Sequence, residues 1–174
     1  MAETDPGVAA WKEETSAFDR VRSVAATLSE PRDAGDIAAE AHVSENTARD
    51  HLGRLVDMNV LLRHGQSGTT VYERDPLHTR MQTLRELLDE QDHEELLAVK
   101  ADLQERIEDW RAEYVVDSPA ELRERAAETD TADESREIQE TASEWDRLAY
   151  RLGIVEEAIE NYSTYTQGRN SPAN

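Results

Sequence analysis

The chain has 174 residues and a net charge of -20, from 39 acidic and 19 basic residues. Only 37% of the residues are hydrophobic, with one Phe, three Trp and five Tyr, so we expect thin apolar seams between helices rather than a thick core. The absence of cysteine excludes disulfides and thiolate metal sites, and the acidic first residues and lack of a long apolar run predict a soluble cytoplasmic protein.

Prolines and helix-capping signals divide the chain into predicted helices. Asp75-Pro76 and Ser118-Pro119 each place a capping side chain before a proline in the first helical position. The apolar spacing predicts helices over 16–28, 33–41, 44–57, 77–90, 92–115, 119–128 and 134–164. The apolar register is lost at 89–92, which indicates a bend or break there. Residues 1–15 and 165–174 are expected to be flexible tails.

Residues 60–74 interrupt the helical pattern. Val60, Leu61 and Leu62 form a short apolar run, the stretch from Gly65 to Gly68 has the composition of a turn, and residues 69–72 are β-formers. This pattern predicts a hairpin of two short strands. So small a hairpin cannot stand alone, so it must pack on the preceding helices.

The order helix, helix, short turn, helix and β-hairpin describes a winged helix-turn-helix over 16–75. Val43 is an apolar plug in the turn, Ser44 caps the next helix, and Ala48, Leu52, Leu55 and Val56 lie on the inner face of that helix. The outward positions are Glu45, Asn46, Arg49, Asp50, Gly53 and Arg54. The predicted fold is mostly α, with a short hairpin wing and a long-helix, coiled-coil-like region over 76–164.

Two motifs here resemble archaeal winged-helix transcription regulators of the broad ArsR-like class. They are V-S-x-N-T-A-R-x-x-L-x-x-L, from Val43 to Leu55, and G-x-x-G-T-T-x-Y, from Gly65 to Tyr72. The S-P-x-E-L element at Ser118 and the W-x-x-L-x-x-x-L helix at Trp145 look like those of a haloarchaeal family of predicted regulators. The resemblance covers about residues 15–162 and implies binding of double-stranded DNA.

The outer face of the 44–57 helix would then enter the major groove, where Asn reads adenine and Arg reads guanine. Asn46 and Arg49 are the expected base readers, and Asp50 would accept from cytosine or hold an arginine in place. The complete predicted DNA-binding set is Ser44, Asn46, Thr47, Arg49, Asp50, Arg54, Arg63, Ser67, Thr69 and Thr70, of which the last four lie in the wing. The alternative is a protein-interaction module that binds a transcription or chromatin component and leaves this helix solvated.

The region after residue 76 carries apolar stripes at three- and four-residue spacing. A long helix with one such stripe must pair within the chain or between chains, and we expect homodimerisation because two copies read a longer site. The predicted dimerisation residues are Trp145, Leu148, Leu152, Val155, Ile159, Tyr162, Leu103, Ile107 and Trp110. A three-helix bundle within one chain remains the alternative, and a ligand pocket in the stripe is a second one.

The acid excess is uneven and is typical of proteins from a high-salt cytoplasm. Seventeen of the 19 basic residues are Arg, and residues 34–74 carry a net charge of -2 against -15 for residues 75–174. Molar salt shortens the Debye length to about 3 Å and screens such self-repulsion. A disordered acidic chain is the alternative, but the regular apolar periodicity argues against it.

Motifs for catalysis and metal binding do not stand out in the sequence. The five histidines are 9 to 15 residues apart, so none forms an H-x-x-x-H pair, and no phosphate-loop or nucleophile-elbow motif occurs. We therefore expect that the protein has no enzyme activity and binds no cofactor or metal. We also expect it to be a regulator that is associated with the nucleoid in the cytoplasm.

Overall fold

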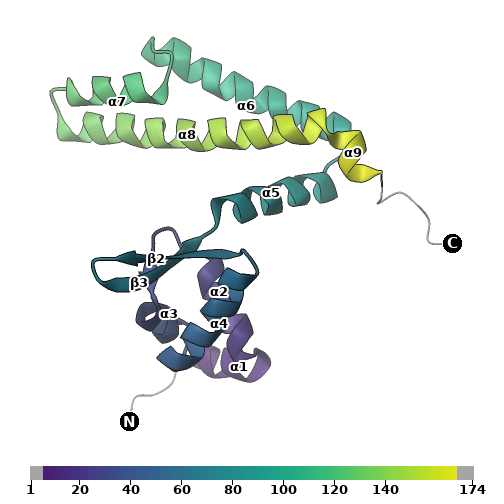
Figure 1. Ribbon diagram of the computed structural model, residues 1–174. Coiled ribbons are helices and arrows are strands. Elements are labelled where there is room, and N and C mark those ends of the chain that lie inside the picture. Colours follow the sequence, from purple (N-terminus) through teal and green to yellow (C-terminus); the bar gives the residue numbers. More distant parts are fainter. Residues whose placement is uncertain (1–5, 168–174) are drawn as a thin grey trace. The chain divides into compact units, whose positions relative to one another are not determined.

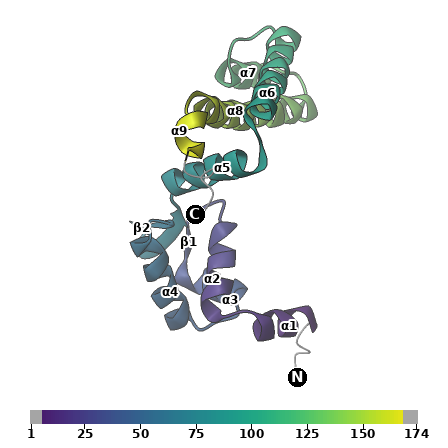
Figure 2. The same ribbon diagram turned by 90° about the vertical axis from the view of Figure 1, so that its right-hand side faces the viewer.

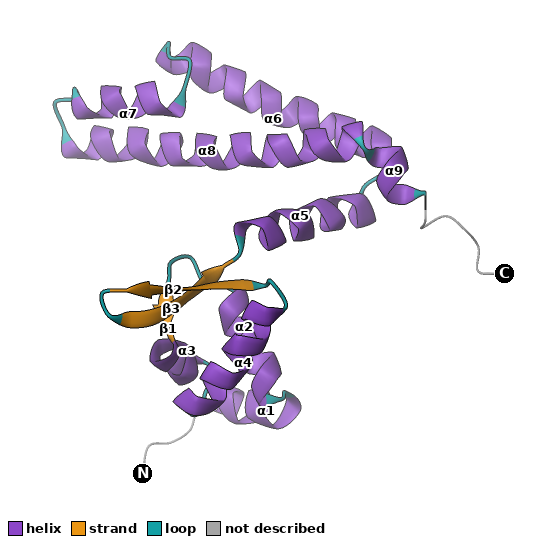
Figure 3. Ribbon diagram, in the orientation of Figure 1, coloured by secondary structure: helices purple, strands orange, loops and turns teal. Residues whose placement is uncertain are grey.

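The computed structural model describes residues 6–167 and is mostly helical, with one small antiparallel sheet (Figures 1 and 3). Two compact units make up the chain, Met1–Met81 and Gln82–Asn174. The helices are α1 (Pro6–Glu14), α2 (Ala17–Ala26), α3 (Ala34–Glu40), α4 (Glu45–Asp57), α5 (Pro76–Glu90), α6 (His93–Tyr114), α7 (Pro119–Ala127), α8 (Ala132–Glu160) and α9 (Tyr162–Thr166). The strands are β1 (Arg32–Asp33), β2 (Leu61–Gln66) and β3 (Thr69–Arg74).

The predicted helices are present, with ends that differ by at most two residues in the first six. Two stretches differ from the prediction. Residues 1–15 were expected to be a tail, but helix α1 occupies Pro6–Glu14, and Trp11 packs against the core of the N-terminal unit. The last helix was expected to run to residue 164, but α8 ends at Glu160 and α9 follows from Tyr162. The predicted C-terminal tail began at residue 165, but residues 165 and 166 belong to α9, and residues 168–174 lie outside the described residues.

Side-chain caps define the helix starts of the N-terminal unit. Ser16, Asp33 and Ser44 each accept a hydrogen bond from the backbone N–H three residues later, at the starts of α2, α3 and α4. The Ser16 hydroxyl also donates to the Asp19 carboxylate at 2.6 Å, which holds the pKa of Asp19 below its ordinary value. Capping by Ser44 confirms the local signal predicted from the sequence, whereas the caps at Ser16 and Asp33 were not predicted.

The core of the N-terminal unit lies between α2, α3, α4 and the sheet. Val21, Ile37, Leu52 and Leu55 are completely buried there, as is Ala48. Figures 1 and 2 show these helices gathered beside the hairpin, and α2 and α3 both contact β3 while α4 contacts β2. The helices therefore supply the apolar surface that the hairpin lacks.

The sheet has three strands in the order β1-β3-β2, all antiparallel, where the sequence predicted two. The additional strand is β1, whose Arg32 and Asp33 pair with Tyr72 and Val71 of β3. The hairpin turn is also shorter than predicted. Because Gln66 pairs with Thr69, only Ser67 and Gly68 form it, with positive φ angles of 51° and 83°. Those angles belong to the two-residue type I′ turn, whose second position favours glycine.

The C-terminal unit is built along α8. Helices α6 and α7 both lie against α8 and run antiparallel to it, one after the other along its length (Figure 1). The cluster between them contains Ile107, Trp110, Leu122, Ala142 and Trp145. Asp92 and Glu95 form a capping box at the start of α6, which confirms the predicted break after α5. None of the helices within residues 6–167 combines the length and apolar character needed to cross a membrane.

The buried face of α8 is wider than its predicted apolar stripe. Trp145 and Val155 of the stripe are buried, but so are Ile154 and Ala158, which lie outside it. The C-terminal half of α8 contacts α9 as well as α6, and a helix packed by more than one neighbour buries a wider arc. A three- and four-residue stripe therefore predicts only part of what α8 buries.

Candidate nucleic-acid interface

Helix α4 has one apolar and one polar face, as its spacing predicts. Asn46, Arg49 and Asp50 are exposed, and Gly53 follows at the next turn of the same face. The opposite face carries Ala48, Leu52 and Leu55, all fully buried. The polar face is therefore fixed in orientation by the core behind it.

The arginine on this face is held by an acid of its own helix. Arg49 donates from its guanidinium to the carboxylate of Glu45, one turn earlier. Asp50 was predicted to accept from cytosine or to hold an arginine in place, but the acid that pairs with Arg49 is Glu45. Both Arg49 and Glu45 remain more than half exposed, so the pair is accessible from solvent. An exposed pair of this kind is weak and can exchange for a stronger acceptor.

The start of α4 forms a compact hydroxyl cluster. The Oγ of Ser44 accepts a hydrogen bond from the backbone N–H of Thr47 at 3.1 Å and lies 2.7 Å from the Thr47 Oγ1. Ser44 is exposed and Thr47 half-buried. Both predicted site residues therefore belong to the helix cap, at the end of α4 where the helix dipole favours an anion.

Arg54 lies at the edge of the polar face and is positioned by α2. Its guanidinium carbon is 4.6 Å from the centroid of the Phe18 ring, within the range of a cation–π contact. The ring of His51 meets the same phenyl ring edge-on, with centroids 5.5 Å apart. Phe18, the only phenylalanine of the chain, is not in the predicted DNA-binding set.

The hairpin extends exposed residues beside α4. Arg63 of β2, Ser67 in the turn and Thr69 and Thr70 of β3 are all exposed, whereas Val71 anchors the strand in the unit. The predicted wing residues thus share one hairpin, and its base contacts α4 through β2. Gly65 was expected to be in the turn but lies within β2, opposite Thr70.

Arg20 was not predicted to have a role, but its side chain is hydrogen-bonded to the turn between α3 and α4. It is buried in α2, and its Nε donates to the carbonyl of Ala41 at 3.1 Å, while a terminal nitrogen donates to the carbonyl of Thr15 at 2.7 Å. His42, which follows Ala41, has a φ of 51° and packs edge-on against Trp11. A buried arginine has no periodic signature, because only the fold supplies the carbonyls that it binds.

The predicted dimerisation residues fall into two groups. Trp145, Val155, Ile107 and Trp110 are buried within a single chain, and the rings of Trp110 and Trp145 lie 6.0 Å apart. These four residues are therefore buried within one chain, and Ile107, Trp110 and Trp145 belong to a single cluster. The other members are half-buried, namely Leu103, Leu148, Leu152, Ile159 and Tyr162. Only this second group retains apolar surface that a second copy could cover.

Residues 34–74 of the N-terminal unit offer arginines for nucleic-acid contact but carry a net charge of -2. Residues 34–74 contain six acids and four arginines, and one of the acids, Glu73, lies 3.6 Å from the Nδ1 of His64 on the hairpin. Among the described residues, no group of three or more histidine, aspartate or glutamate side chains is placed to hold a metal ion. What the unit presents is a polar helix face with an adjacent hydroxyl-rich hairpin.

Residues 15–164 match the profile of the family of unknown function DUF7342. The matched segment begins two residues before α2, ends in the middle of α9 and so covers most of both units. In the same comparisons, no curated protein and no solved structure matches the chain. Because the match extends over most of the sequence, the chain belongs to the family of unknown function DUF7342.

Proposed function

We propose that this protein is a transcription regulator that binds DNA sequence-specifically as a homodimer, through a winged helix-turn-helix in its N-terminal unit. The observation that carries the proposal is the outer face of α4, where Asn46, Arg49 and Asp50 are exposed on a helix whose other face is fully buried. A helix that presents short polar side chains on a rigid support can enter the major groove.

Base reading would fall to Asn46 and Arg49. The Asn side chain matches the N6 and N7 atoms of adenine, and the Arg fork matches O6 and N7 of guanine. Arg49 already has its guanidinium held at the surface by Glu45, so it would exchange an exposed pair for a bidentate one. Asp50, one residue further, can accept from the amino group of cytosine.

Phosphate contacts would position the unit on the duplex. Ser44 and Thr47 lie at the positive end of α4, Arg54 is held at the edge of the same face by Phe18, and the wing supplies Arg63 and Thr70. Along α4, Ser44 precedes the base-reading positions and Arg54 follows them. Such contacts fix register without reading sequence.

The slightly negative net charge of residues 34–74 fits DNA binding at high salt. Counterion release contributes little to affinity when salt is already molar, so hydrogen bonds, apolar contacts and fit must supply the affinity. With four arginines against six acids in residues 34–74, the unit does not depend on a strong positive field. Dimerisation would add affinity by bringing two half-sites together.

The test is a mobility-shift titration with DNA from upstream of the protein's own gene, in molar KCl, against an excess of random competitor DNA. The proposal predicts a shifted complex that survives the competitor and is lost with Asn46→Ala. The second candidate, a protein-interaction module, predicts no shift at any salt concentration while the chain stays folded by circular dichroism. A complex that the competitor removes completely would contradict sequence-specific reading.

A further inference from the structure

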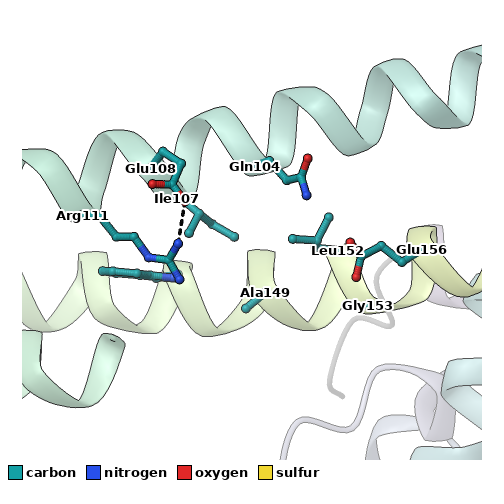
Figure 4. A pocket seen from close by; sticks show the side chains of 9 residues that line it. Gln104, Ile107, Glu108, Arg111, Ala149, Leu152, Gly153 and Glu156 are labelled. Atoms are coloured by element: carbon teal, nitrogen blue, oxygen red, sulfur yellow. Dashed lines mark hydrogen bonds and ion pairs between the residues drawn. The ribbon is translucent and has the colours of Figure 1, made fainter. Parts of the chain in front are cut away.

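A groove opens between α6 and α8 in the C-terminal unit, and DNA binding by the N-terminal unit gives it no role. It has a volume of about 460 Å³ and a lining that is part polar and part apolar, with apolar surface from Ile107 of α6 and from Trp145 and Leu152 of α8. In Figure 4, the side chains of Gln104 on α6 and Glu156 on α8 extend into the space between the two helices. This volume lies in the range of sites for small organic molecules, which typically combine an apolar floor with a few polar groups.

Gly153 gives the groove its space. It lies in the interior of the 29-residue helix α8 and lines the groove. A Cβ atom on Gly153 would meet no heavy atom within 4 Å, so packing within the chain does not require glycine here. Because glycine weakens a helix, its presence at this position is explained if the groove must stay open for an occupant.

The charges of the groove favour a positively charged occupant. Glu108 and Glu156 lie at its two ends, and each carboxylate can accept several hydrogen bonds beyond its ion pair with Arg111 or Lys100. Arg111 is the basic side chain among the lining residues, and Glu108 already occupies it. The net charge of -15 over residues 75–174 repels anions from this unit and attracts cations.

A second copy of the chain fits this groove poorly. Glu156, Glu157 and Glu160 follow Gly153 at three-, four- and seven-residue spacing, so they lie on the same face of α8. A two-fold interface places the same patch of both copies together and would set these acids against each other. Charge therefore favours a small cation over a second α8 helix.

We propose that the groove between α6 and α8 binds a small organic cation with an apolar, aromatic body. The body lies on Ile107 and Leu152 in the space left by Gly153, and the positive charge lies between Glu156 and Glu108. This site does not rest on the proposed DNA binding, since every residue that forms it belongs to the C-terminal unit.

The test is a fluorescence titration of the full chain, because Trp145 lines the groove and Trp110 is next to it. The probes are tetraphenylphosphonium and tetraphenylborate, which have the same shape and opposite charge. We expect saturable quenching by the phosphonium ion at one site per chain, and binding of the borate at least roughly tenfold weaker in dilute salt. No saturable quenching, or equal affinity for both ions, would overturn the proposal.

Substitutions in and outside the groove test its position. Gly153→Leu fills the space, so we expect a loss of affinity of roughly tenfold or more. Glu156→Gln keeps the volume and removes one charge, for an expected loss of roughly two- to fivefold. Glu140→Gln, the same change at an exposed acid of α8 outside the groove, is the matched control and should leave binding unchanged.

Circular dichroism and light scattering complete the design. A Gly153→Leu or Glu156→Gln variant that keeps its helical signal and still binds the phosphonium ion like the parent chain would overturn the site. A Gly153→Leu variant that turns from dimer to monomer would also overturn it, because a second copy would then occupy the groove. DNA affinity, measured separately, should be the same for Gly153→Leu and the parent chain.

Discussion

Gly53 of α4 offers a substitution in which protein stability and DNA affinity should move in opposite directions. A Cβ at this position would meet no heavy atom of the chain within 4 Å, so Gly53→Ala creates no clash in the free protein. Alanine is favoured over glycine in a helix by about 1 kcal/mol. For the N-terminal unit, Met1–Met81, that gain raises the melting temperature by about 4–8 °C.

In the complex the same methyl group would point at DNA. Gly53 shares the outer face of α4 with Asn46, Arg49 and Asp50, and extra volume in a packed interface costs about 1–3 kcal/mol. DNA affinity should therefore fall by roughly 5- to 150-fold while the free protein becomes more stable.

The matched control for Gly53→Ala is Gly153→Ala, in α8. It makes the same change in a helix with the same open surroundings, so it should stabilise the chain without altering DNA affinity. Calorimetry gives the stability change and fluorescence anisotropy with labelled DNA gives the affinity. A Gly53→Ala protein that is stabilised and binds DNA like the parent chain would refute close approach of DNA to this face. A Gly53→Ala protein with a lower melting temperature than the parent chain would show that the added methyl group clashes within the protein.

Four further outcomes are expected. Asn46→Ala and Arg49→Ala should each reduce the free-energy preference for the native site over random DNA by about 1–3 kcal/mol in competition titrations. An unchanged preference in both variants would place α4 outside the major groove of DNA. Ser67→Ala and Thr70→Ala should instead weaken binding to native and random DNA by similar factors, since phosphates carry no base identity; a loss confined to the native site would contradict this. Thermal unfolding from dilute to molar KCl should show rising stability because the net charge of -15 over residues 75–174 is progressively screened, and a flat or falling curve would exclude the high-salt interpretation. Leu152→Asp should lower the free energy of unfolding by several kcal/mol and reduce the helical signal of the C-terminal unit, because Leu152 packs against the cluster of Trp110 and Trp145. A variant that stays fully helical and becomes monomeric would instead place the contact of Leu152 between chains.

The local features of α4 could be predicted from sequence because each depends on neighbours along the chain. Ser44 caps the helix by accepting a hydrogen bond from the backbone N–H three residues later. The three- and four-residue spacing of Ala48, Leu52 and Leu55 determines which face of the helix is buried. Once that face is fixed, the positions of Asn46, Arg49 and Asp50 follow from helix geometry.

Features that depend on distant partners were missed. Strand β1 has two residues and exists only because β3, about 40 residues later, offers it a free edge. The bond of Arg20 to Ala41 and the stacking of Arg54 on Phe18 likewise join helices far apart in sequence. The turn was misplaced because Gly65 and Gly68 are equally good turn residues, and the pairing of Gln66 with Thr69 decides between them.

The apolar stripes of the C-terminal unit illustrate a different limit. Spacing shows that Trp145 and Leu152 need a partner, but a partner in the same chain and one in another chain require the same pattern. The antiparallel placement of α6 against α8 covers Trp145, Val155, Ile107 and Trp110 within one chain. It leaves Leu148 and Leu152 half-buried, so surface for a second copy is smaller than the stripes suggest.

The most direct test of the central claim is selection of binding sites from a pool of random DNA in molar KCl, with the parent chain and an Asn46→Ala, Arg49→Ala double variant in parallel. Sequence reading by the outer face of α4 predicts that the parent chain enriches one motif with two related half-sites. The double variant should enrich none, although its circular dichroism matches that of the parent. Enrichment of no motif by the parent chain, or of the same motif by the double variant, would contradict DNA reading by this face.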